Sequence, residues 1–115
     1  MADDCIFCKI VKGDIPCSKV YEDEKVLAFD DIHPMAPVHV IVIPKKHIPT
    51  LLDCAGENKA DLAAVMAAAQ EAAKRKGVDQ KGFRTVINCN DEGGQVIFHL
   101  HAHVLGGKKL ADEMG

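Results

Sequence analysis

The sequence of 115 residues has no apolar run long enough to cross a bilayer, so we expect no contact with a membrane. It also lacks an excess of basic residues. The 14 Lys and Arg against 17 Asp and Glu give a formal net charge of −3, which argues against a nucleic-acid partner. The first residues, Met-Ala-Asp-Asp, have neither the basic nor the apolar region of a secretion signal. Repeats, low-complexity tracts and linkers are missing too, so residues 1–115 are expected to form a single domain.

The cysteines do not form the even-numbered set typical of a secreted disulfide framework. They are Cys5, Cys8, Cys17, Cys54 and Cys89. An odd number and the missing signal predict thiols in a reducing compartment, and therefore a cytoplasmic location. Most are expected to be small buried apolar side chains. Cys5 and Cys8 lie one helical turn apart, so both thiols can face one side; a lone C-x-x-C can be a redox pair, half of a metal site or neither.

Helical spacing of apolar residues predicts two helices. Residues 5–12 form a short helix with Asp4 as its N-cap and Gly13 as its stop. Its expected apolar face is Ile6, Phe7, Ile10 and Val11. A long helix covers about residues 58–76, with Asn58 as N-cap and Gly77 as stop. Its expected buried stripe is Leu62, Val65, Met66, Ala69, Ala72 and Ala73.

Five segments are expected to be strands: 19–22, 26–32, 38–43, 83–88 and 98–107. Residues 38–43, VHVIVI, are nearly all apolar and β-branched, which is typical of a central strand. Short loops between consecutive strands favour antiparallel pairing. We therefore predict an α+β fold, with one antiparallel sheet of about five strands and both helices on one side of it.

The last predicted strand, FHLHAHVLGG, carries histidines at alternate positions: His99, His101 and His103. Successive strand side chains point to opposite faces, so the three imidazoles would share one face at intervals of about 6.6 Å. Imidazole can act as nucleophile, acid, base or metal ligand near neutral pH. The row is therefore compatible with phosphate chemistry, with a metal site or with chance. Gly93 and Gly94 precede the strand, and their backbone N–H groups could form an anion-binding nest or merely a tight turn.

Several blocks of the sequence, in order, resemble the histidine triad (HIT) family of nucleotide hydrolases and transferases. They are CIFCKIVKGDIP, VYEDEKVLAFDDI, MAPVHVIVIPKKHI, NDEGGQ and HLHAHVL. The branch that the chain resembles is that of the small nucleoside phosphoramidases, also called histidine triad nucleotide-binding proteins. Only the long-helix region and the tail match loosely.

The resemblance implies a hydrolase that releases AMP or a similar purine nucleotide from a nucleoside 5′-phosphoramidate. His101 matches the nucleophile that attacks the α-phosphorus, and water then cleaves the nucleotidyl-histidine. His103 matches the residue that contacts the phosphate and assists the leaving group, and His39 matches a supporting histidine. From the residues alone, His39 could equally be a core histidine bonded to a backbone carbonyl.

The resemblance also implies a substrate site for a purine nucleotide of AMP or GMP type. Asp31 matches a ribose-binding carboxylate, although by itself it would read as a solvated residue at a strand end. The apolar slot for the base matches Phe7, Ile15, Phe29 and Ile32. Contacts on the phosphate and leaving-group side match Asn88, Gly94, Gln95 and the backbone of Val96. Many members have serine where this chain has Val96, and the tail lacks an aromatic ending seen in some, so the leaving-group preference stays open.

Two further properties follow from the resemblance. Members of this size are homodimers paired through the long helix and the fourth strand. Some bind structural zinc, and the matching ligands here are Cys5, Cys8, His47 and His99, with two buried thiols beside unrelated histidines as the alternative. No organic cofactor is expected.

Two other functions compete with the hydrolase. One is a nucleotide-binding interaction module with little turnover. The other is a metal-dependent oxygenase or hydrolase that uses all three histidines. The sequence argues against the latter, because no acidic ligand stands near the triad and His99 has a place in the zinc site.

Overall fold

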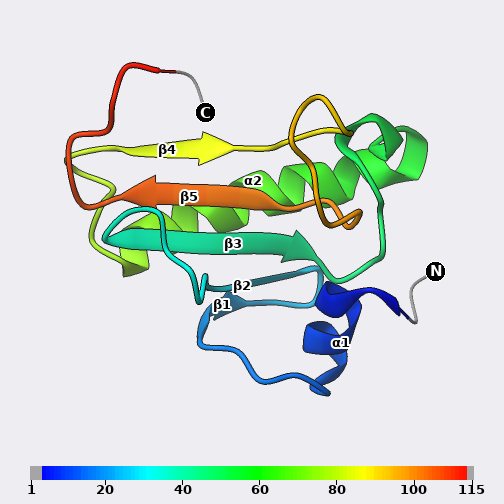
Figure 1. The fold of residues 1–115 in the computed structure, drawn as a ribbon. Coiled ribbons are helices and arrows are strands. Elements are labelled where there is room, and N and C mark those ends of the chain that lie inside the picture. The colour runs from blue at the N-terminus through cyan, green and yellow to red at the C-terminus, as the bar shows by residue number, and fades with distance from the viewer. Residues whose placement is uncertain (1–3, 114–115) are drawn as a thin grey trace.

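The computed structural model describes residues 4–113; the acidic start at 1–3 and the last two residues of the tail lie outside the described residues. The elements are α1 (Ile6–Lys12), β1 (Lys19–Glu22), β2 (Val26–Asp30), β3 (Val38–Pro44), α2 (Lys59–Arg75), β4 (Phe83–Val86) and β5 (Ala102–Gly106) (Figure 1). Two 3-10 turns, Leu51–Asp53 and Gly56–Asn58, precede α2. Within residues 4–113, no helix has the length and apolar character that a membrane crossing requires.

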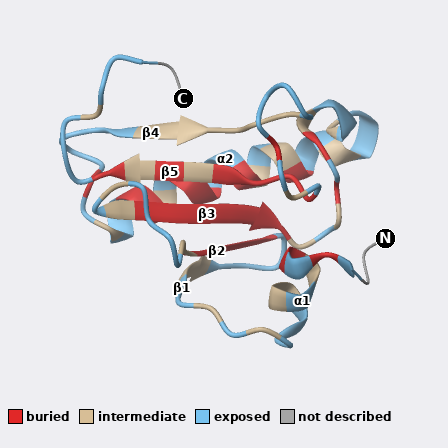
Figure 2. Ribbon diagram, viewed as in Figure 1, coloured by how far each residue is buried: buried red, intermediate tan, exposed pale blue. Residues whose placement is uncertain are grey.

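The five strands form one antiparallel sheet in the order β1-β2-β3-β5-β4, which confirms the predicted α+β class. The apolar run of β3 occupies the centre of this sheet, as its composition predicted, and its residues from His39 onward are buried (Figure 2). β1 and β4 form the two edges and are largely half-buried or exposed. The sheet therefore places β5, near the end of the chain, beside β3.

The prediction that both helices cover the same face is wrong. α2 packs on one face, where its alanines meet Val26, Val40 and Val104. On the opposite face, Phe7 of α1 packs among Leu27, Phe29, Ile41 and Ile43. The reason is that β2 and β3 are apolar on both faces, and a strand of this kind must be covered on both.

The termini of α1 correct one predicted cap and confirm the other. The N-cap is Cys5, whose Sγ accepts the backbone N–H of Cys8 at 3.4 Å; Asp4 lies one residue too early to cap. Gly13 ends the helix with φ of 88°, which explains glycine there. Phe7 is buried, whereas Ile6, expected on the apolar face, is 44% exposed.

The buried face of α2 is centred slightly away from the predicted stripe. Val65, Ala69, Ala72 and Ala73 are buried as expected, but Ala68 replaces Met66, which is 38% exposed. Asn58 occupies the N-cap position without a capping bond from its side chain, which instead donates to the carbonyl of Asp53. The small side chains let α2 approach the sheet closely.

The histidine strand is shorter than predicted, since β5 starts at Ala102 and residues 98–101 are not strand. The β3–β5 ladder begins at the pair Val42–Ala102. Before that point the chain turns toward the segment after β3, where the backbone N–H of Leu100 donates to the carbonyl of Ile48 at 2.7 Å. Likewise, the predicted strands 26–32 and 83–88 end earlier, at Asp30 and Val86.

Candidate active site and metal centre

The three imidazoles lie on one side of the sheet, as their alternation predicted, although only His103 belongs to β5. That side is the one that α1 covers. Ala102 and Val104 face α2, which turns His103 to the other face. The ring centroids of His101 and His103 are 5.0 Å apart. Phe7 packs edge-on against both His99 and His101, at 5.8 and 5.1 Å between ring centroids. The row is therefore anchored by α1.

His101 is held in one tautomer by its own backbone neighbour. Its Nδ1 lies 2.7 Å from the carbonyl oxygen of His99, and because a carbonyl only accepts, Nδ1 must carry the proton. Burial lowers the pKa of His101, which favours the neutral ring. A neutral imidazole with Nδ1–H keeps the lone pair on Nε2. His101 therefore has the electronic form that a nitrogen nucleophile requires.

His103 and His39 form a second hydrogen-bonded group with Asp31. Nε2 of His39 lies 2.9 Å from Nδ1 of His103 and 3.4 Å from Oδ2 of Asp31. Burial, followed by the nearby His101 and His39, lowers the pKa of His103 to about 4. Burial also lowers the pKa of His39. The argument that no acidic group stands near the triad is thus wrong, because β2 and β3 bring Asp31 to it.

A pocket of about 350 Å³ opens beside this group. The predicted apolar slot residues all line it: Phe7, Ile15, Phe29 and Ile32. Asp31 and His103 complete it, so the carboxylate and an imidazole border an apolar cavity. Phe7 and Phe29 meet edge to face, with ring centroids 5.9 Å apart. Residues that sequence reasoning missed also line the pocket, among them Cys17, Ile41 and Ile97, whose apolar character gave no signal beyond that of core residues.

The side chain of Gln95 braces the loop before the histidines. The Gln95 amide donates to the carbonyls of Pro49 and Ile97 at 2.8 and 3.0 Å, and its oxygen accepts the N–H of Asn90. The backbone N–H of Gly94 donates to the carbonyl of Asp91. Of the two alternatives for this glycine pair, an anion nest or a tight turn, the N–H of Gly94 takes part in a turn.

Other features of this loop define what it can offer. A Cβ on Gly93 would lie 2.4 Å from the carbonyl oxygen of Cys89, so the chain approaches too closely there for any side chain. The Val96 side chain is 87% exposed. The described residues that line the pocket do not include the predicted phosphate-side and leaving-group-side contacts Asn88, Gly94, Gln95 and Val96.

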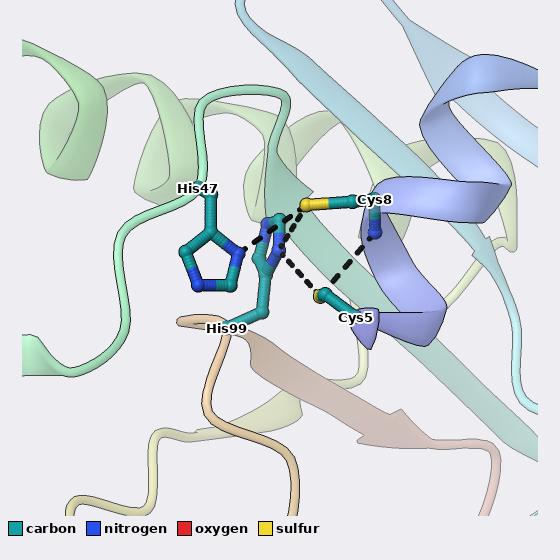
Figure 3. Close-up of side chains that lie close together, drawn as sticks. All are labelled: Cys5, Cys8, His47 and His99. Carbon is teal, nitrogen blue, oxygen red and sulfur yellow. Dashed lines mark hydrogen bonds between the residues drawn. The ribbon is translucent and has the colours of Figure 1, made fainter. Parts of the chain in front are cut away.

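The four predicted zinc ligands converge at the N-terminus of α1 (Figure 3). The donor atoms of Cys5, Cys8, His47 and His99 all lie within 4.8 Å of one another. Nδ1 of His99 is 3.2 Å from Sγ of Cys5, and Nδ1 of His47 is 3.3 Å from Sγ of Cys8. These residues come from α1, the segment after β3 and the segment before β5, so tertiary structure alone unites them.

The chemistry of this cluster fits a metal ion. Two sulfurs and two imidazole nitrogens are a donor set that zinc binds tetrahedrally. Nε2 of His99 donates to the carbonyl of Pro44 at 2.8 Å, so the lone pair of Nδ1 points at the thiols. A metal-binding histidine typically uses its other N–H in this way. None of the five cysteines, all of them within the described residues, forms a disulfide.

Asp31, His39 and His103 also bring donor atoms within 4.8 Å of one another, but their hydrogen bonds oppose metal binding. The backbone N–H of Met35 donates to Nδ1 of His39 at 3.0 Å. If Nε2 of neutral His39 bound a metal, the ring proton would have to lie on Nδ1. That proton would then point at the backbone N–H of Met35, and two donors would face each other. This group therefore fits a hydrogen-bond relay.

The fold and site define a class: small α+β proteins in which a buried, neutral histidine with an available ring nitrogen stands beside an apolar pocket bordered by a carboxylate. A family model for the HIT domain matches residues 12–110, and the chain belongs to the histidine triad (HIT) family.

Relatives of known sequence or structure agree with this assignment. Purine nucleoside phosphoramidase of Escherichia coli is 41% identical over 110 residues, which cover 96% of this chain and 92% of that protein. An uncharacterized HIT-like protein of Synechococcus elongatus is 46% identical over 96% of both chains. A histidine triad protein from Clostridium difficile superposes with a TM-score of 0.91 at 49% identity, covering 96% of both chains. A HIT family hydrolase from Legionella pneumophila gives 0.92 at 43% identity, covering 97% of this chain and all of that one.

Proposed function

We propose that this protein is a purine nucleoside phosphoramidase, a hydrolase that cleaves the phosphorus–nitrogen bond of nucleoside 5′-phosphoramidates and releases AMP or GMP. The observation that carries the proposal is the hydrogen bond from Nδ1 of His101 to the carbonyl of His99, because it leaves Nε2 as a nucleophile. Hydrolases among the relatives support the reaction class, as does the phosphoramidase of E. coli.

In this proposal the pocket binds the nucleoside. The purine occupies the apolar slot of Phe7, Ile15, Phe29 and Ile32, and the Asp31 carboxylate accepts hydrogen bonds from the ribose hydroxyls. The α-phosphate is then directed toward the histidine row. Asn88 and the backbone N–H of Val96 contact the phosphate, while Gly94 and Gln95 hold the loop in the conformation that presents Val96. A histidine triad nucleotide-binding protein from Candida albicans, which superposes with a TM-score of 0.81 at 30% identity and 97% coverage of this chain, supports a nucleotide ligand.

The proposed reaction has two displacements at phosphorus. Nε2 of His101 forms a bond to the α-phosphorus, and the phosphorus–nitrogen bond of the substrate breaks. The amine leaves with that electron pair and takes a proton from Nε2–H of His103. Water then attacks the nucleotidyl-histidine, its proton passes to His103, and the phosphorus–histidine bond breaks. The products are a nucleoside monophosphate and a neutral His101.

We further propose that Cys5, Cys8, His47 and His99 bind a structural Zn²⁺. Bound zinc would supply a cross-link between α1, the segment after β3 and the segment before β5, outside the chemical steps. The proposed assembly is a homodimer through α2 and β4. β4 is an edge strand, and Phe83 on it and Met66 on α2 leave apolar surface exposed. The proposed location is the cytoplasm, where the five thiols would stay reduced.

Release of AMP from adenosine 5′-phosphoramidate tests the proposed activity. We expect multiple turnovers by the wild-type chain without added metal or cofactor. AMP binding without turnover would instead support the second candidate, a nucleotide-binding interaction module. The relative from Candida albicans, which is named as a nucleotide-binding protein, supports that candidate.

Replacing Val96 with serine is expected to raise the rate of amine release by a few fold, because the added hydroxyl can hydrogen-bond the leaving group or a phosphate oxygen, at about 1 kcal/mol per bond. The side chain is 87% exposed, so the substitution should not perturb the core. kcat and KM for several amine leaving groups would measure the effect. Val96→Ala is the matched control without a hydroxyl, and unchanged turnover in the serine variant would contradict the assignment.

The pH dependence should follow the lowered pKa values of the histidines. Burial lowers the pKa of His103 to about 4 and also lowers the pKa of His101, so both rings stay neutral below the ordinary value of 6.5. kcat/KM is therefore expected to hold as the pH falls through 6.5 and to drop only at lower pH, where protonation removes the Nε2 lone pair of His101. Stability should fall in the same direction, since unfolded histidines bind protons below 6.5 before the folded ones do. An acid limb centred at 6.5 or above would contradict this.

A further inference from the structure

His101 and His103 are the same residue type, 5.0 Å apart, yet the proposed reaction needs a lone pair on Nε2 of the first and a proton on Nε2 of the second. Residue type cannot provide this difference. We propose that the backbone N–H of Met35 sets the tautomer of His39 and, through it, that of His103, so that His103 presents Nε2–H to the substrate. This inference rests on the proposed function for its catalytic meaning.

The first step is the contact between His39 and the backbone of the loop that contains Met35, between β2 and β3. The backbone N–H of Met35 lies 3.0 Å from Nδ1 of His39. An amide N–H only donates, so Nδ1 of His39 must accept and cannot carry a proton. His39 is buried, and burial lowers its pKa, so the ring is neutral. A neutral ring without a proton on Nδ1 has it on Nε2.

The second step passes this choice to His103. Nε2–H of His39 faces Nδ1 of His103 at 2.9 Å and Oδ2 of Asp31 at 3.4 Å, and both are acceptors. Because His39 donates to it, Nδ1 of His103 carries the lone pair. The proton of neutral His103 must then lie on Nε2. His101 has the opposite tautomer, because its Nδ1 meets a carbonyl.

The loop that holds Met35 is fixed by other bonds rather than by the Met35 side chain. That side chain is 77% exposed, so its identity matters little. The Asp31 carboxylate accepts the N–H of His33 at 2.8 Å, and the Asp31 N–H donates to the carbonyl of His39 at 2.9 Å. Pro34 precedes Met35 and restricts the backbone. Met35 is therefore a positioning residue that acts through its amide.

An amide-to-ester substitution at Met35, made by semisynthesis of the full chain, tests the inference. It replaces the N–H with an oxygen that cannot donate and leaves every side chain unchanged. We expect His39 to move its proton to Nδ1 and His103 to lose the proton from Nε2. The ¹⁵N shift of His103 Nε2 should then change from that of a protonated to that of an unprotonated ring nitrogen. kcat/KM should fall by roughly tenfold or more, as for loss of a positioned acid.

Two controls isolate the amide. Met35→Ala keeps the N–H and should keep both the tautomer and the rate. An ester at Ala36, whose N–H makes no hydrogen bond within residues 4–113, should do the same. The side-chain amide of His39→Gln cannot relay a proton, but it can still donate a hydrogen bond to Nδ1 of His103, whereas His39→Leu cannot. We therefore expect the glutamine variant to retain much more activity than the leucine variant.

The outcomes separate this inference from the proposed function. An unchanged His103 tautomer in the Met35 ester overturns the inference, whatever the rate. A tautomer change with an unchanged rate overturns its catalytic part. Absence of AMP release by the wild-type chain overturns the proposed function, and the ¹⁵N spectra still decide whether Met35 sets the tautomer.

Discussion

Replacing His101 with alanine is expected to reduce AMP release from adenosine 5′-phosphoramidate by on the order of 10⁴-fold or more, as losses of a nucleophile do. In the wild-type chain, the bond from Nδ1 of His101 to the carbonyl of His99 keeps the lone pair on Nε2 of His101. His103 has its proton on Nε2 and cannot replace it. Steady-state and single-turnover assays would measure the loss.

His101→Asn is the matched control for folding. Its amide N–H₂ can still donate to the carbonyl of His99, so that buried acceptor keeps a partner, but no ring nitrogen remains to attack phosphorus. We expect the asparagine variant to be as inactive as the alanine variant and closer to wild type in stability, with a difference of about 1–3 kcal/mol for the unsatisfied carbonyl. AMP release within tenfold of wild type by either variant would contradict covalent catalysis by His101.

The intermediate offers an independent check on the same step. Rapid quenching of the wild-type reaction should trap a nucleotide on the peptide that contains His101, as an adduct that acid releases. Neither His101 variant should give it. A nucleotide recovered on the His103 or His39 peptide instead would reassign the nucleophile.

Replacing Cys8 with serine is expected to lower the melting temperature by roughly 10 °C or more, because binding of a structural metal contributes several kcal/mol to folding. The cluster joins residues 94 positions apart in the chain, such as Cys5 and His99. Without the metal, the N-terminus of α1 would lose a tie to the sheet, and Phe7 on α1 packs against both His101 and Phe29. Thermal unfolding with and without a chelator would measure the loss.

Cys54→Ser is the matched control, since Cys54 is also a half-buried thiol but lies outside the cluster. It should change the melting temperature by only a few degrees and leave the metal content intact. Elemental analysis of protein purified without added zinc or chelator should give about one zinc per chain for the wild type and for this control. Less than about half an equivalent in the wild type would contradict a stable site.

Much of the fold followed from local patterns. The apolar, β-branched run 38–43 predicted the central strand, and short connections predicted antiparallel pairing. Gly13 predicted the end of α1 because only glycine readily adopts its positive φ. The alternation of histidines predicted a row on one face. These features depend on residues within a few positions of one another, which is why they can be predicted from the sequence.

What only the tertiary structure decided depends on contacts between distant segments. The composition of a strand that is apolar on both faces does not determine which face a given helix covers. The placement of α1 on the face opposite α2 therefore follows only from the tertiary structure. The point where β5 begins depends on where its partner β3 can pair. The roles of His101 and His103 differ because one meets a backbone carbonyl and the other, through His39 at 64 positions away, a backbone amide. Backbone carbonyl and amide groups recur along the whole chain and mark no residue in the sequence. The sequence alone therefore determined that three histidines alternate in one segment, and packing decided which nitrogen of each ring carries the proton.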